Sequence, residues 1–144
     1  MIHLQMLGEF IVEHPVAILG CIAANMIIGN VWYGPIFGKA WRHFNGIHHT
    51  GKPTMQTMLP AMLVSIFTAF VQALVIGRSM QILAIGSWVD PIVITLVLWV
   101  PFTLLTFATN YAYLKKPFTL LMIDTGFVLI SLWATSLVIY STAL

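Results

Sequence analysis

Charged residues are scarce in this chain of 144 residues. Only 7% of its residues are Asp, Glu, Lys or Arg, whereas about a quarter are charged in an ordinary soluble domain. The formal net charge of +2 is small, and no basic tract points to nucleic acid. The composition therefore excludes an ordinary soluble domain and gives no support to a nucleic-acid partner.

Cysteine and the common enzyme signatures are also nearly absent. Cys21 is the single cysteine, so an intrachain disulfide is excluded. The chain has no Gly-x-Ser-x-Gly, no complete phosphate-binding glycine loop, no His-Glu-x-x-His and no paired carboxylates. We predict no catalytic residue and no cofactor, and the interpretation leans away from an enzyme.

The histidines of the segment after the first apolar run do not form a convincing metal site. His48 and His49 are adjacent, so on a helix they point about 100° apart. His43 lies five residues earlier, and no Cys or acid nearby completes a four-ligand set. A solvated loop is the better interpretation, and no metal is predicted.

Long apolar runs dominate what is present. Hydrophobic residues make up 60% of the chain, and the mean hydropathy is +0.97. Four runs, at about 15–33, 58–77, 91–114 and 117–140, reach the ~20 residues that a helix needs to span a membrane. We predict one membrane domain over 1–144, an all-α integral membrane protein with four transmembrane helices in an antiparallel bundle. Pro101 predicts a kink in the third helix.

The charges predict an orientation in a bacterial inner (plasma) membrane. The connections 34–57 and 115–116 carry most of the Lys and Arg, whereas Glu9, Glu13 and Asp90 fall on the opposite side with Arg78. The positive-inside rule then places both connections in the cytoplasm and both termini outside. Because acidic residues precede the first run, we expect it to be retained and not cleaved as a signal peptide.

The segment 34–53 predicts a short interfacial amphipathic helix after helix one. Apolar and basic residues alternate there at helical spacing, which suits a helix lying at the cytoplasmic interface. The apolar side has Ile36, Phe37, Ala40, Trp41 and Phe44, and the other side has Lys39, Arg42 and His43. A tight helical loop packed on the bundle is the alternative.

Each span carries small or polar residues along one face, which lets helices approach closely. The rows are Ala17, Gly20, Cys21, Ala24 and Asn25 in helix one; Ala61, Ser65, Thr68 and Gln72 in helix two; Thr95, Trp99, Thr103, Thr106, Asn110 and Tyr113 in helix three; and Asp124, Val128, Ser131, Thr135 and Thr142 in helix four. They indicate either packing contacts between helices or a hydrated cavity.

Asp124 is the only acid well inside a predicted span, where a carboxylate is costly. By depth it shares the inner half of the membrane with Asn30 and Asn110, and basic side chains can reach it from the loops. We predict a polar cluster and candidate ligand or ion site of Asp124, Asn30, Asn110, Lys39, Tyr33 and Tyr113. Its role is either to hold the segment 34–41 against the bundle or to form a proton- or cation-coupled site.

Two ordered motifs resemble a known family. They are Asn30-Val-Trp-Tyr-Gly-Pro-Ile-Phe-Gly-Lys-Ala-Trp41, and Thr109-Asn110-Tyr111 followed by Lys116-Pro117 and Ile123-Asp124-x-Gly126. The chain is similar in both to the bacterial membrane proteins of domain of unknown function 1761. The resemblance implies a four-helix membrane protein of this size and transfers no catalytic role. The histidines of the first loop depart from the family pattern.

We therefore expect a structural or accessory membrane subunit, or a module that binds lipid or a partner, and that forms homo-oligomers. A small proton- or cation-coupled transporter or channel built on Asp124 is the alternative. The expected partners are the lipid bilayer, further copies of the chain, and an unidentified membrane partner or small ligand.

Overall fold

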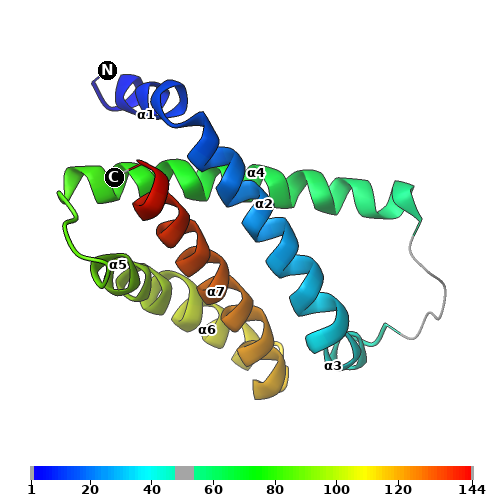
Figure 1. Ribbon diagram of the computed structural model, residues 1–144. Helices are drawn as coiled ribbons and strands as arrows, with labels where there is room; N and C mark the ends of the chain where they lie inside the picture. Colours follow the sequence, from blue (N-terminus) through cyan, green and yellow to red (C-terminus); the bar gives the residue numbers. More distant parts are fainter. Residues whose placement is uncertain (1, 48–53, 144) are drawn as a thin grey trace.

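The computed structural model describes residues 2–47 and 54–143, with side chains from residue 8 onward. Every regular element in these two ranges is helical (Figure 1). Four helices are long and apolar enough to cross a membrane: Pro15–Ile36, Met55–Ile82, Asp90–Tyr113 and Phe118–Ala143. The all-α membrane fold predicted from the sequence is confirmed.

The first span changes its helical geometry before it ends. Helix α2 (Pro15–Val31) runs into a π-helical turn, η1 (Trp32–Ile36), and then into the short helix α3 (Gly38–Phe44). Pro35 lies inside η1 and has no N–H to donate, which favours a departure from the regular hydrogen-bond ladder. Helix α3 is the short helix predicted after the first span. His48, His49 and Lys52 lie outside the described residues.

The third span is also interrupted at a proline. It consists of α5 (Asp90–Trp99), the π-helical turn η2 (Val100–Leu104) and α6 (Leu105–Tyr113). Pro101 lies in η2, where the sequence predicted a kink. Residues 114–117 join α6 to α7 (Phe118–Ala143), and Lys115 takes a left-handed φ of +52° in this turn. The connection is therefore tight.

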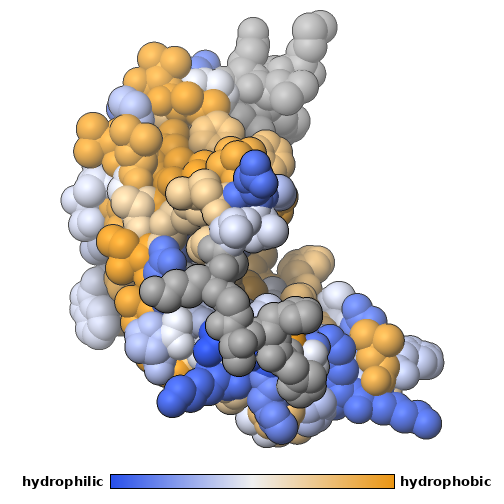
Figure 2. Space-filling view, turned by 90° about the vertical axis from the view of Figure 1, so that its right-hand side faces the viewer, coloured by the Kyte–Doolittle hydropathy of each residue, from blue (hydrophilic) through white to orange (hydrophobic). Residues whose placement is uncertain are grey.

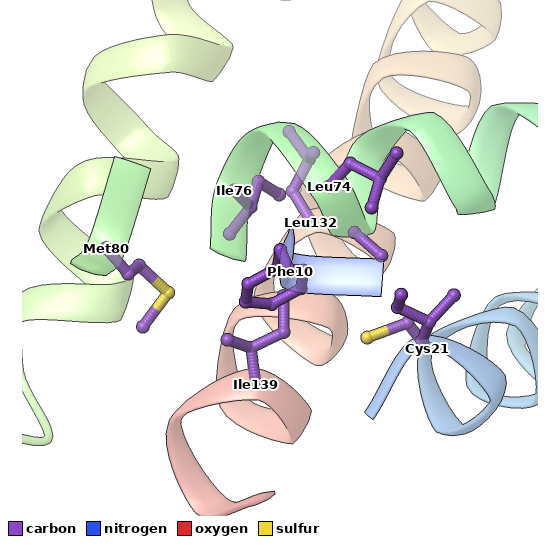
Figure 3. Packing of buried hydrophobic residues seen from close by; sticks show 9 residues of the cluster. Phe10, Cys21, Leu74, Ile76, Met80, Leu132 and Ile139 are labelled. Atoms are coloured by element: carbon purple, nitrogen blue, oxygen red, sulfur yellow. The ribbon is translucent and has the colours of Figure 1, made fainter. Parts of the chain in front are cut away.

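A helix that the sequence patterns did not predict precedes the first span. Helix α1 (Ile2–Glu13) packs on the C-terminal part of α4 (Met55–Ile82) through Phe10, which is fully buried against Gly77. Figure 3 shows Phe10 within a buried cluster that includes Ile76 and Ile139. The polar pairs Arg78–Glu9 at 3.7 Å and Gln81–His14 at 3.3 Å border this contact.

Helix α7 is the centre of the fold, and α4 is only partly attached to it. Helix α7 packs against α2, α4, α5 and α6. Both termini lie at one end of the molecule, and α3 and the α6–α7 turn lie at the other (Figure 1). Helix α4 crosses this assembly, so that its first half extends away from α7. All residues from Thr54 to Thr68 except Met62 are exposed.

Candidate functional site

Three aromatic side chains converge on the carboxylate of Asp124. The Tyr33 hydroxyl lies 3.1 Å from Oδ1, the Trp41 Nε1 lies 3.0 Å from the same oxygen, and the Tyr111 hydroxyl donates to Oδ2. We call these four residues the Asp124 node. Its donors come from η1, α3 and α6, so one carboxylate joins the end of the first span, the interfacial helix and the third span to α7.

Two further indoles fix the backbone on either side of Asp124. Trp32 donates from Nε1 to the Ile123 carbonyl at 2.9 Å, and Trp99 donates to the Thr125 carbonyl at 2.8 Å. An indole N–H in an apolar setting needs such a partner. The Trp32 ring passes so close to Gly126 that a Cβ at this position would lie 3.2 Å from it. Gly126 thus permits the approach of Trp32 to α7.

Lys116 contacts the Asp124 node at the ring of Tyr111 and not at the carboxylate of Asp124. The Lys116 Nζ lies 5.1 Å from the centre of the Tyr111 ring, within the range of a cation–π contact. Among the described residues, Asp124 makes no ion pair with Lys or Arg. Its hydrogen-bond partners are neutral phenol and indole groups, so three donors, and no counter-ion, satisfy the carboxylate.

The structure distributes the other predicted site residues elsewhere. Asn30 donates to the Met26 carbonyl at 2.9 Å, and Lys39 is exposed on α3. Asn110 is exposed, and Tyr113 is 85% exposed. Successive residues of a helix point about 100° apart. Because Tyr111 faces Asp124, its neighbour Asn110 cannot point the same way.

Sequence reasoning missed Trp41 and Tyr111 as partners of Asp124. Trp41 was assigned to the apolar side of the interfacial helix, and Tyr111 belonged to a motif without a role. The available signal was the need of Asp124 for hydrogen-bond donors together with aromatic hydroxyl and indole groups at the same end of the spans. Lysine, the partner that the basic loops suggest, makes no bond to the Asp124 carboxylate among the described residues.

One residue from the predicted polar row of the first span and one from that of the third span contact α7 through polar side chains. The Asn25 Nδ2 lies 2.9 Å from the Thr135 Oγ1, and the Thr95 and Ser136 hydroxyls are 3.0 Å apart. Both contacts join buried or half-buried side chains and act between helices. The row of the second span differs, because Ser65 on α4 is exposed and bonds only the Ala61 carbonyl of its own helix.

A cavity of about 420 Å³ lies between α2 and the first half of α4, with Phe127 of α7 on one wall. Its polar lining is small and its remaining lining is apolar. The polar residues are Asn25, Asn30, Tyr33, Ser65 and Thr68, and the others are Met26, Gly29, Met58, Ala61, Met62, Val64, Ala69 and Phe127. Tyr33 belongs to both the lining and the Asp124 node, whereas Asp124 itself does not line this cavity. Size and lining fall within the usual range of sites for small, mainly apolar ligands.

These features define a four-helix membrane protein in which a half-buried carboxylate joins the first, third and fourth spans. The chain belongs to a family described as a protein of unknown function, DUF1761, whose model matches residues 16–140. The two motifs that carried the resemblance supply Tyr33, Trp41, Tyr111 and Asp124, and the fold brings them into one node. No curated protein and no solved structure matches the chain.

Proposed function

We propose that this protein is an accessory module of the bacterial inner membrane that binds the apolar part of a lipid or similar amphiphile. The cavity between α2 and α4 is the observation that carries this proposal. It combines an apolar lining with a few hydrogen-bonding groups, which is the usual composition of a small-molecule site between helices. The exposed first half of α4 leaves the cavity open to the surrounding lipid.

In this proposal the Asp124 node is structural. Its three bonds hold α3 and the ends of two spans against α7, and they also orient Tyr33, whose ring contacts Phe127 with centroids 5.0 Å apart. The wall of the cavity therefore depends on the node. Satisfaction of the carboxylate by neutral donors supports this role over the alternative of a proton- or cation-coupled transporter.

Orientation and self-association are parts of the same proposal. We place the basic end with α3 in the cytoplasm and both termini outside, because Lys39, Arg42, Lys115 and Lys116 gather at the end opposite the termini. The third span favours homo-oligomers. Only 6% of its most apolar stretch is buried, against 33% for the fourth span, and it carries the exposed polar residues Thr106 and Asn110.

A pair of phenylalanine substitutions on α4 tests ligand binding. Ala61 is exposed and lines the cavity, so Ala61→Phe projects a ring into it. Leu63 is 58% exposed on the same helix and does not line the cavity, so Leu63→Phe is the matched control. Native mass spectrometry of protein titrated with phosphatidylcholine should show bound lipid for wild type and Leu63→Phe, and a severalfold loss for Ala61→Phe. Equal binding by both variants, or no lipid bound to wild type, would overturn the proposal.

A further inference from the structure

Helix α3 carries two exposed cations beside the residue that attaches it to α7. Trp41 turns toward Asp124, while Lys39 and Arg42 are exposed. In Figure 2, hydrophilic residues gather at the end of the molecule that carries α3. The Trp41–Asp124 bond thus holds α3 with its apolar residues inward and its cations outward, as an interfacial helix requires.

The cations of α3 have no acidic partner in the described part of the chain. Glu9, Glu13 and Asp90 belong to the end with the termini, and Glu9 pairs with Arg78. Asp124 is occupied by its three aromatic donors. The positive charge of α3 therefore has no acidic partner within residues 2–47 and 54–143, which leaves it free to pair with an external anion.

The same helix adjoins the wall of the cavity. The Trp41 ring meets the Tyr33 ring edge to face at a centroid distance of 5.5 Å, and Tyr33 lines the cavity. The lining also includes Asn30, which lies in the last part of α2, and α2 leads through η1 directly to α3. The wall of the cavity that Tyr33 forms is therefore in contact with α3, the helix that carries Lys39 and Arg42.

We infer that Lys39 and Arg42 form the headgroup site for an anionic phospholipid whose acyl chain occupies the cavity between α2 and α4. This inference rests on the proposed function, because it assigns the polar half of the same ligand. A basic side chain near a membrane surface strengthens the binding of anionic lipid by about fivefold. The site selects phosphatidylglycerol over phosphatidylcholine because only the former carries a net negative charge.

The test compares two exposed lysines at the same end of the molecule. Lys39→Gln removes a cation of α3, and Lys115→Gln removes one from the α6–α7 turn. Each full-length variant is titrated with phosphatidylglycerol and with phosphatidylcholine of identical chains, and bound lipid is counted by native mass spectrometry. We expect wild type and Lys115→Gln to prefer phosphatidylglycerol. Lys39→Gln should bind it about fivefold more weakly and bind phosphatidylcholine unchanged. Melting temperatures verify that each variant is folded.

The outcomes separate this inference from the proposed function. Equal affinity of wild type for the two lipids, with both lost in Ala61→Phe, would overturn the headgroup site and support the tail site. An equal loss of phosphatidylglycerol in Lys39→Gln and Lys115→Gln would also overturn it, because a diffuse surface charge would then explain the preference. If folded wild type binds neither lipid, both proposals are contradicted.

Discussion

The indole Nε1 of Trp41 lies 3.0 Å from Oδ1 of Asp124, so one side chain of the interfacial helix is attached directly to the central helix α7. The same oxygen accepts from Tyr33, and the other oxygen accepts from Tyr111. Asp124 therefore connects α7 to the neighbouring segments η1 and α3, which lie more than 80 residues earlier in the sequence, and to α6, which precedes α7 directly. These three hydrogen bonds explain why a carboxylate lies inside a span, and the explanation requires no bound proton or cation.

Replacing Asp124 by leucine should destabilise the protein, and replacing it by asparagine should do so much less. Hydrogen bonds between membrane helices average about 0.6 kcal/mol, so loss of three costs about 2 kcal/mol. Asparagine retains an oxygen for Tyr33 and Trp41, and the Tyr111 hydroxyl can turn to accept from its amide. Unfolding in detergent by a graded denaturant measures the difference. Equal stability of Asp124→Leu and wild type would contradict a structural node.

The turn between the first span and α3 depends on Gly38. A Cβ added at Gly38 would collide with the Tyr33 carbonyl, whereas one added at Gly34 meets nothing within 4 Å. We expect Gly38→Ala to displace α3 and weaken the Trp41–Asp124 bond, and Gly34→Ala to be well tolerated. Hydrogen exchange of α3 reports the displacement. Faster exchange in both variants, or in neither, would show that this close approach does not position α3.

Much of the fold could be predicted because hydropathy and charge act locally. The four apolar runs predicted the four spans, and the spacing of apolar and basic residues such as Ile36, Lys39 and Phe44 predicted the interfacial helix. Helix α1 was missed because its order comes from a distant contact, the insertion of Phe10 against Gly77. The residues of α1 alone do not reveal that Gly77, on α4, leaves room for the Phe10 ring.

The sequence predicted Asp124 as the centre of the candidate site, but it predicted only one of its three hydrogen-bond partners, Tyr33. The cost of a carboxylate in the membrane identified Asp124, and depth placed Tyr33 near it. Depth alone, however, could not distinguish Asn110 from Tyr111, because the rotation of α6 decides which of the two faces α7. The cavity was beyond sequence reasoning, since it arises from the angle at which α4 leaves the bundle and not from any residue pattern.

The contact of Phe10 with Gly77 predicts a compensating pair of substitutions. Gly77→Ala places a methyl group in the position of the Phe10 ring and should detach α1 from α4. Phe10→Ala removes a fully buried ring and should cost about 3–5 kcal/mol if the surroundings do not collapse. In Phe10→Ala/Gly77→Ala the clash is relieved, so the double variant should be more stable than the sum of the two single effects implies. A double-mutant cycle from denaturant unfolding measures this coupling, and additive effects would contradict direct packing.

The exposed polar face of the third span predicts how copies of the chain meet. The Asn110 amide makes no side-chain hydrogen bond within the described residues, and a second copy can supply its partner across a two-fold axis. We expect the detergent-corrected mass of wild type to exceed that of one chain, and Asn110→Leu to shift it toward the monomer. Thr119→Leu is the control, because Thr119 is exposed on α7 and lies outside the third span. A wild-type mass equal to one chain would exclude self-association, and an oligomer unchanged by Asn110→Leu would place the interface elsewhere.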